Sequence, residues 1–247
     1  MFLSIKEGAF VIADAHYSDN RPQLFDFLQD VKSNKLKPTQ LIFLGDIFDS
    51  LFGGIPITKE INQKVIDLIN DISNNIEIIY LEGNHDFNLK NIFPNIKIFP
   101  ISKQPVECRY NDKKVLLAHG DIESSFSYRL YTSIIRNRFV LFVLNIINDI
   151  SNNKIIEKLN YHLSKKDDCN EFTNFDEYIK RRLEDKYKCD YFIEGPFHQN
   201  KSVKFSDFIY INLASFACNQ RYFSVKSVKE LELLEKIYLK GDVYGTS

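Results

Sequence analysis

Short apolar runs alternate with amphipathic stretches along the first hundred residues. Residues 10–13, 41–44 and 76–81 are apolar and rich in β-branched side chains, which is typical of short buried strands. Between them, two stretches carry apolar side chains at helical spacing: residues 21–34, where Pro22 suits a first turn, and residues 58–73, where Thr58 suits an N-cap. Strands that alternate with helices predict right-handed crossover units on a mostly parallel sheet.

The pattern changes after residue 95. Shorter strands are expected at residues 96–99, 106–110, 115–118, 191–193, 208–213 and 221–225. Residues 124 to about 188 carry helical patterns, which predicts a helical insertion at about 122–188 within a single domain that covers residues 1–247. The pattern of residues 229–239 fits a helix and a strand equally.

Composition and charge narrow the function classes. With 247 residues, of which 44% are hydrophobic and 26% charged, the chain is long enough to bury one good core. The formal net charge of -1 gives no overall electrostatic attraction for nucleic acid, so no nucleic acid is expected as a partner. The basic residues between 180 and 188 alternate with acidic ones, as on a solvated helix face.

The cysteines and the N-terminal residues indicate the cellular compartment in which the protein is expected. Cysteines 108, 169, 189 and 218 are scattered with no C-x-x-C pair, which favours reduced thiols over a disulfide framework or a zinc knuckle. The N-terminus reaches Lys6 too early for the apolar part of an export signal. The most apolar run, residues 139–144 with two more apolar residues nearby, is about half of the roughly 20 residues that a spanning helix needs. We therefore expect a cytoplasmic protein without a membrane-spanning helix.

Four of the five histidines follow strand-like runs at once or within a residue or two. They are His16, His85, His119 and His198. The carboxyl ends of parallel neighbouring strands meet at one edge of a sheet, so these histidines should converge with Asp14, Asp46 and Asn84. Imidazole mixed with carboxylate and amide oxygens predicts a centre for manganese, iron or zinc rather than magnesium, and Asp46 is the candidate to bridge two ions.

The order of these motifs is similar to that of a known family. D-x-H at 14–16, G-D-x-x-D at 45–49, G-N-H-D at 83–86, the strand-end His119 and G-x-x-H at 195–198 resemble the calcineurin-like metallophosphoesterases. The resemblance implies an α/β fold, a four-layer αββα sandwich with a helical lid insertion, and hydrolysis of phosphate esters or anhydrides. It also implies two divalent metal ions, with Mn²⁺ the expected ion. By motif, the first would be held by Asp14, His16, Asp46 and His198, and the second by Asp46, Asn84 and His119.

The resemblance also assigns catalytic roles. Two divalent cations lower the pKa of a shared water and neutralise charge that develops on phosphoryl oxygens. His85 is expected to steady those oxygens or to protonate the leaving oxygen, with Asp49 or Asp86 as its orienting partner. The alternative is that His85 only packs.

One position departs from the family pattern. The family usually ends in G-H-x-H, but this chain has proline at position 196, which has no side-chain donor. Two alternatives follow: a loosely held second ion, or a centre reduced to one metal.

The insertion indicates a substrate class. His119-Gly-Asp121, followed by an apolar helical stretch with Arg129, Arg136 and Arg138, resembles the UDP-2,3-diacylglucosamine hydrolases of lipid A synthesis. That resemblance implies cleavage of the diphosphate to UMP and 2,3-diacylglucosamine 1-phosphate. It also implies a lid that holds acyl chains, substrate contacts by Asn84 and the three arginines, and peripheral contact with the inner face of the cell membrane. Three alternatives remain at this point: ordinary packing of the lid, a different phosphodiester or phosphomonoester, and a binding or scaffold protein on the same fold.

Overall fold

The computed structural model describes residues 3–120, 126–165, 169–226 and 234–238, with only the main chain at residues 126–129, 131 and 234–238. One sheet has the strand order β14-β13-β2-β3-β5-β7. Strands β2 (Phe10–Ile12), β3 (Gln40–Phe43), β5 (Glu77–Leu81) and β7 (Lys97–Phe99) run parallel. Strands β13 (Arg221–Val225) and β14 (Leu234–Tyr238) extend the sheet in antiparallel fashion, so part of the undecided tail is a strand.

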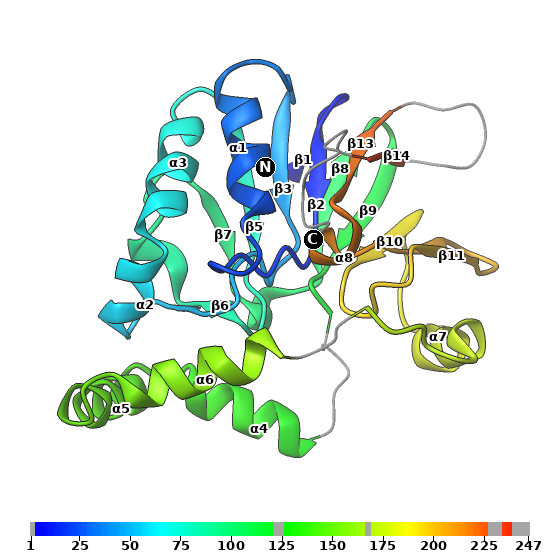
Figure 1. Ribbon diagram of the computed structural model, residues 1–247. Coiled ribbons are helices and arrows are strands. Elements are labelled where there is room, and N and C mark those ends of the chain that lie inside the picture. Colours follow the sequence, from blue (N-terminus) through cyan, green and yellow to red (C-terminus); the bar gives the residue numbers. More distant parts are fainter. Residues whose placement is uncertain (1–2, 121–125, 166–168, 227–233, 239–247) are drawn as a thin grey trace.

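The second sheet lies face to face with the first (Figure 1). Its order is β1-β8-β9-β10-β12-β11, built from β1 (Leu3–Ser4), β8 (Val106–Tyr110), β9 (Lys113–Leu117), β10 (Tyr191–Glu194), β12 (Ile209–Asn212) and β11 (Lys201–Lys204). Buried side chains of both sheets, such as Val11 and Ile42 from one and Leu117 and Ile193 from the other, form the core between them. This burial on both faces explains the near-continuous apolar strands in the sequence.

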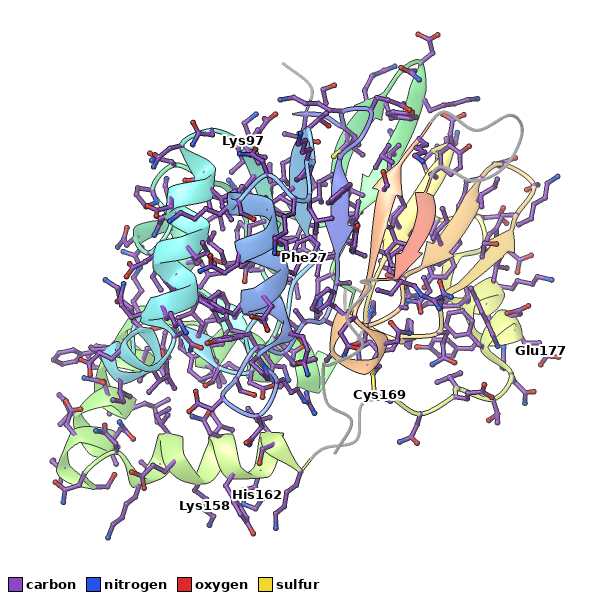
Figure 2. The ribbon with its side chains drawn as sticks, turned by 45° about the horizontal axis from the view of Figure 1, so that its top comes forward. Phe27, Lys97, Lys158, His162, Cys169 and Glu177 are labelled. Atoms are coloured by element: carbon purple, nitrogen blue, oxygen red, sulfur yellow. A yellow bond between two sulfur atoms is a disulfide. The ribbon has the colours of Figure 1, made fainter. Side chains whose placement is uncertain are left out.

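Helices cover the two outer faces. Helices α1 (Gln23–Lys32) and α3 (Gln63–Ser73) pack on the first sheet through their apolar stripes, and Phe27 of α1 points into that layer (Figure 2). Helix α7 (Phe175–Leu183) packs on the second sheet through Phe175 and Ile179. The predicted four-layer αββα sandwich is therefore confirmed. Helix α7 falls within the range predicted for the insertion, but it forms the fourth layer.

The helix predicted at residues 58–73 is divided in two. Helix α2 (Pro56–Ile61) begins before Thr58, and α3 begins after Asn62. The prediction of Thr58 as an N-cap is wrong: its hydroxyl is buried inside α2 and donates to the carbonyl of Ile55 over 2.7 Å. The amide of Asn62 donates to the carbonyls of Ser50 and Thr58, which fixes the break.

Three lid helices lie against one end of the sandwich (Figure 1). They are α4 (Phe126–Ile135), α5 (Arg138–Ile150) and α6 (Lys154–Ser164). Lys158 and His162 project from α6 away from the sandwich (Figure 2). In the described part of the chain, no single helix combines the length and the apolar character of a membrane span; α5 and α6 do so only as a pair, bent by 100°.

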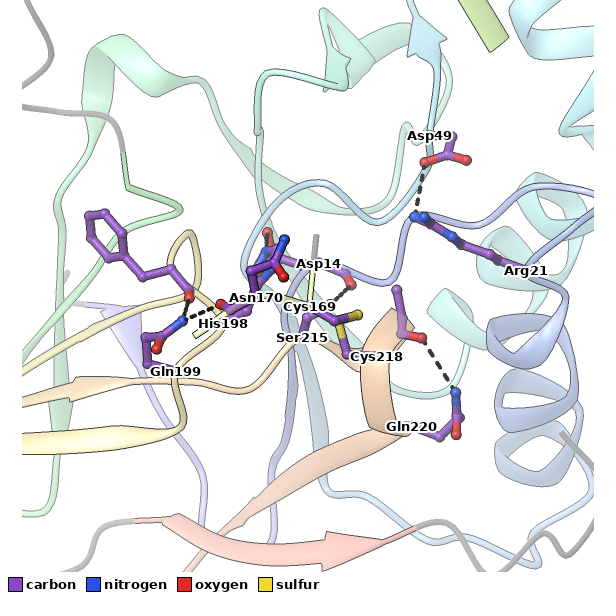
Figure 3. Close-up of a disulfide and its surroundings, with 12 residues drawn as sticks. Asp14, Arg21, Asp49, Cys169, Asn170, His198, Gln199, Ser215, Cys218 and Gln220 are labelled. Carbon is purple, nitrogen blue, oxygen red and sulfur yellow. Dashed lines mark hydrogen bonds and ion pairs between the residues drawn. A yellow bond between two sulfur atoms is a disulfide. The ribbon is translucent and has the colours of Figure 1, made fainter. Parts of the chain in front are cut away.

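Cys169 and Cys218 form a disulfide, with their Cα atoms 5.7 Å apart (Figure 3). The expectation of reduced thiols is wrong for this pair, because the fold brings together two cysteines that are 49 residues apart in the sequence. Cys218 belongs to the short helix α8 (Phe216–Asn219), and Cys169 lies between the lid and α7. Cys108 and Cys189 are free thiols.

Candidate metal centre

The loops that follow five strands bring the predicted ligands to one end of the two sheets. Asp14 and His16 follow β2, Asp46 follows β3, Asn84 follows β5, and His119 and His198 follow β9 and β10. The main chain is left-handed at Asp14, His16, Asp46 and His198, with φ between 45° and 56°. Aspartate and histidine tolerate this region better than most residues, and such strained positions are concentrated at functional sites.

The described residues include three overlapping groups whose ligand atoms lie within 4.8 Å of one another. These groups are Asp14 with His16 and His198, Asp14 with Asp46 and His119, and His16 with Asp46 and His85. In the first group, His198 Nε2 lies 3.2 Å from Asp14 Oδ1. In the second, His119 Nε2 lies 3.5 Å from Asp46 Oδ2 and 3.3 Å from the side-chain oxygen of Asn84. The predicted ligands are therefore close enough to share cations.

The donor chemistry fits divalent cations. Asp14 Oδ2 is buried and has no hydrogen-bond partner among the described residues, as expected of an oxygen that serves a metal ion. Glycines allow the close approach of the ligands: a Cβ on Gly83 would lie 2.1 Å from Asp46 Oδ1, and one on Gly45 would lie 2.5 Å from His119 Nδ1. A side chain at either glycine would displace a ligand.

Electrostatics also favour positive charge here. Burial alone would raise the pKa of Asp46, but His119, His85 and His16 lower it to about 2. Burial lowers the pKa of His16, yet the Asp49 hydrogen bond and the nearby carboxylates outweigh it and leave this pKa above its ordinary value. The centre is thus an anionic pocket that attracts cations.

Main-chain carbonyls fix the tautomers of two histidines. Nδ1 of His119 lies 2.9 Å from the carbonyl oxygen of Leu44, and Nδ1 of His85 lies 2.9 Å from that of Asp49. A carbonyl oxygen only accepts, so each Nδ1 carries the hydrogen and each Nε2 is left to face a metal ion or the substrate.

Asp49 and Asp86 are placed differently from the prediction. The carboxylate of Asp49 lies 3.2 Å from Nδ1 of His16, so it orients that predicted ligand. Towards His85, Asp49 offers its main-chain carbonyl, which accepts from Nδ1. The carboxylate of Asp86 accepts hydrogen bonds from the Tyr80 hydroxyl and from main-chain N–H groups at residues 46, 47 and 83. Burial raises the pKa of Asp86, and the charge of Asp46 raises it further. Asp86 ties the β3 and β5 loops together and does not orient His85.

The predicted substrate arginines lie in different surroundings. Arg136, which follows the last residue of α4, donates to the carbonyl of Gly83 over 2.9 Å and so ties the α4–α5 turn to the loop that carries Asn84. Arg138 is exposed in the first turn of α5, and the side chain of Arg129 lies outside the described residues. A cation missed by the sequence reasoning is Arg21, whose Nη1 lies 3.7 Å from Asp49 (Figure 3). No motif contains Arg21, so no sequence signal identified it.

Pro196 occupies space next to His119. A Cβ on Gly120 would lie 2.1 Å from Cγ of Pro196, so the proline ring packs directly on this glycine. Asp46, Asn84 and His119 thus remain as the predicted second set, without a side-chain donor from position 196.

An apolar cavity of about 330 Å³ separates the lid from the metal centre. Asn84 and His85 line it on the side of the centre, and Phe87, Leu141 and Ile156 are among the apolar residues that line the rest. Leu141 and Ile156 are buried, so the lid packs a core and still leaves a cavity. An acyl chain needs such a lining.

Comparisons with known proteins agree with this arrangement. A family model described as calcineurin-like phosphoesterase matches residues 9–200. UDP-2,3-diacylglucosamine hydrolase of Psychromonas ingrahamii is 28% identical over 143 residues, which cover 55% of this chain and 57% of that protein. The protein of the same name from Haemophilus influenzae strain PittGG is 30% identical over 115 residues, which cover 46% and 48%. The chain spans about half the length of the curated relatives it matches.

Solved structures of low sequence identity are also similar. An archaeal phosphodiesterase is 16% identical with a TM-score of 0.45, covering 94% of this chain and 99% of that one. A phosphoesterase from E. coli is 10% identical with a TM-score of 0.46 at the same coverage.

Proposed function

The chain belongs to the calcineurin-like phosphoesterase family, and we propose that it hydrolyses the diphosphate of an acylated nucleotide sugar of the UDP-2,3-diacylglucosamine class. The products would be UMP and the diacylated sugar 1-phosphate. The observation that carries the proposal is the apolar lid cavity, because Asn84 and His85 of the metal centre form part of its lining. The names of the curated relatives support the same substrate class.

We propose that the centre holds two divalent cations, with Mn²⁺ as the ion. Asp14, His16, Asp46 and His198 would hold the first, and Asp46, Asn84 and His119 the second. When bound, such cations supply an acidified water and neutralise charge on phosphoryl oxygens. The second set has fewer protein donors because position 196 is proline, so its ion would be held less tightly.

Residues of the chain then position the substrate and move a proton. Hydrolysis adds the hydroxyl of water to phosphorus and a proton to the leaving oxygen. When both of its nitrogens are protonated, His85 would supply that proton from Nε2 or offset the charge on the leaving oxygen, because Nδ1 is committed to the carbonyl of Asp49. Asp49 would hold His16 in place through its carboxylate.

The test compares UMP release from the acylated UDP-sugar with release from UDP-N-acetylglucosamine. Leu144 and Val143 form a matched pair on α5, since each is 39% exposed and only Leu144 lines the cavity. Leu144→Trp should lower kcat/KM for the acylated substrate about tenfold or more, because it displaces several methylene groups worth about 0.8 kcal/mol each. Val143→Trp should not. Equal rates on both UDP-sugars would show that the cavity does not recognise acyl chains, and the protein would then be a phosphoesterase of different specificity.

We also propose that the protein works in the cytoplasm, peripherally at the inner face of the membrane. Helix α5 exposes Phe139 by 73%, Phe142 by 60% and Ile150 by 78%, and apolar side chains of this kind enter the lipid interface. Cosedimentation with anionic vesicles should be lost in Phe139→Ser/Phe142→Ser. Because cytoplasmic thiols are kept reduced, the Cys169–Cys218 bond would be open there for much of the time.

A further inference from the structure

We propose that a second, polar cavity, lined in part by α6, binds the nucleoside end of the substrate. This inference rests on the proposed function, because it assumes a substrate with a nucleotide at one end. The cavity has a volume of about 260 Å³. It is lined by Tyr17, Ser18, Asp19, Asn20, Asp49, Ser50, Ile61, Asn62, Asn160, Tyr161 and Ser164.

Helix α6 lines both cavities. Ile156, Leu159 and Leu163 line the apolar cavity, at the i, i+3 and i+7 spacing of one helix face. Asn160, Tyr161 and Ser164 line the polar cavity from a neighbouring face of the same helix. The hydroxyl of Ser50 donates to Asn160 over 2.7 Å, which holds this face of α6 against the β3 loop. Helix α6 therefore presents apolar side chains to one cavity and polar side chains to the other.

Both cavities border the metal centre, at adjacent residues. Asp49 lines the polar cavity, and its carboxylate lies 3.2 Å from Nδ1 of His16. His85 lines the apolar cavity, and its Nδ1 donates to the carbonyl of Asp49. A diphosphate at the metal centre would thus lie near both the apolar and the polar cavity.

The order of the chemical groups along the substrate indicates which cavity each end would occupy. The acyl chains are attached to the sugar, so the sugar must lie on the side of the apolar cavity. The nucleoside, attached at the far end of the diphosphate, is then left with the polar cavity. At about 260 Å³, this cavity is below the roughly 300–1,000 Å³ that a complete small ligand occupies, so it suits one end of a larger molecule.

The polar lining suits a base and a ribose. Tyr161 is 56% exposed; Nζ of Lys165 lies 4.2 Å from the centroid of its ring and covers one face, so the other face is the stacking surface. Asn20 and Asn160 offer amide groups for the edge of a base. The carboxylate of Asp19 can accept from ribose hydroxyls.

The experiment measures how well the Mn²⁺-loaded full chain distinguishes UMP from ribose 5-phosphate, by isothermal titration calorimetry. The base should make UMP bind about tenfold tighter, as expected when a base stacks on an aromatic side chain. In Tyr161→Ala this ratio should fall toward one. In Lys158→Ala, which alters the face of α6 that points away from the sandwich (Figure 2), the ratio should remain as in the wild type.

A second variant, Ser164→Trp, tests the proposal independently if Tyr161→Ala does not fold. Ser164→Trp should fill the cavity and lower the same ratio, and thermal melting reports whether either variant is folded. The proposal is overturned if the wild type binds UMP no better than ribose 5-phosphate, or if a folded Tyr161→Ala and a folded Ser164→Trp both keep the wild-type ratio. A reduced ratio in the variants, combined with no hydrolysis of the acylated UDP-sugar by the wild type, would refute the proposed function and leave the nucleotide site standing.

Discussion

Removal of the Cys169–Cys218 disulfide should destabilise the protein. The bond joins the segment between the lid and α7 to helix α8 (Figure 3). Helix α8 in turn holds Asp14, since the N–H of Ala217 and the hydroxyl of Ser215 both donate to the carbonyl of Asp14, over 3.1 and 2.8 Å. Cys218→Ser therefore loosens an anchor of a predicted metal ligand and opens a long loop.

The length of the loop that the disulfide closes determines how much the free energy of unfolding should fall. The cross-link closes a loop of 49 residues in sequence separation. For a loop of that size, the loss of chain entropy in the unfolded state stabilises the folded protein by about 4 kcal/mol. This is an upper value, because residual structure in the unfolded chain reduces the stabilisation. With a urea m-value of about 2–3 kcal/mol/M, the midpoint of unfolding should fall by about 1–2 M.

The assay is urea unfolding with and without a thiol reductant. The wild type should lose stability on reduction, whereas Cys218→Ser should be equally unstable in both conditions. Cys189→Ser provides a matched control, because Cys189 is a free thiol and its loss should preserve the response to reductant. A thiol titration that finds four free cysteines in oxidised protein, or a midpoint that reduction does not move, would refute the reasoning.

Three further predictions concern the metal centre and the surface charge. His85→Ala should lower kcat about 10²–10⁴-fold, the usual contribution of a general acid or base, while mass spectrometry finds the metal content retained; loss of metal would instead make His85 a ligand. At a free Mn²⁺ concentration that fills only the first site of the wild type, Pro196→His should raise the number of ions bound per chain from about one toward two. An unchanged number would contradict a role for position 196 in the second site. Partial burial raises the pKa of Glu77, but Lys6 and Lys97 lower it to about 2. Its stabilising effect is therefore complete above about pH 4.5 and is lost as the pH falls toward 2, so Glu77→Gln should flatten the fall of the unfolding free energy in that window; an acid unfolding curve parallel to the wild type would contradict this.

The arrangement of strand ends was predictable because two simple rules apply to it. Apolar runs such as residues 10–13 and 41–44 are buried on both faces, and parallel strands place their carboxyl ends at one edge. Polar residues directly after such runs must therefore meet. The convergence of His16, Asp46 and Asn84 follows from these rules alone, because β2, β3 and β5 belong to one sheet. His119 follows a strand of the second sheet and reaches the centre through the packing of the two sheets.

Tertiary contacts decided what the sequence left unpredicted. His85 and Asp86 are neighbours in the chain, which suggested a pair, but the carboxylate of Asp86 accepts from the Tyr80 hydroxyl, whereas Nδ1 of His85 donates to the carbonyl of Asp49. The break between α2 and α3 depends on the hydrogen bond from Asn62 to the distant carbonyl of Ser50. The partner of Cys169 depends on the path of the whole second sheet, which no local spacing records.

The left-handed conformation of four predicted ligands indicates how the centre is held together. Such positions cost of order 1–3 kcal/mol each and persist only where the surroundings over-determine them. Two of these positions are held by hydrogen bonds: Asp86 ties the main chain at Asp46 to that at Gly83, and the hydroxyl of Ser215 donates to the carbonyl of Asp14. A Cβ at Gly83 would also collide with Asp46. These contacts belong to the chain itself, so we expect removal of metal by a chelator to leave the circular dichroism spectrum of the fold unchanged, and a side chain at Gly83 to lower the Mn²⁺ affinity measured by titration.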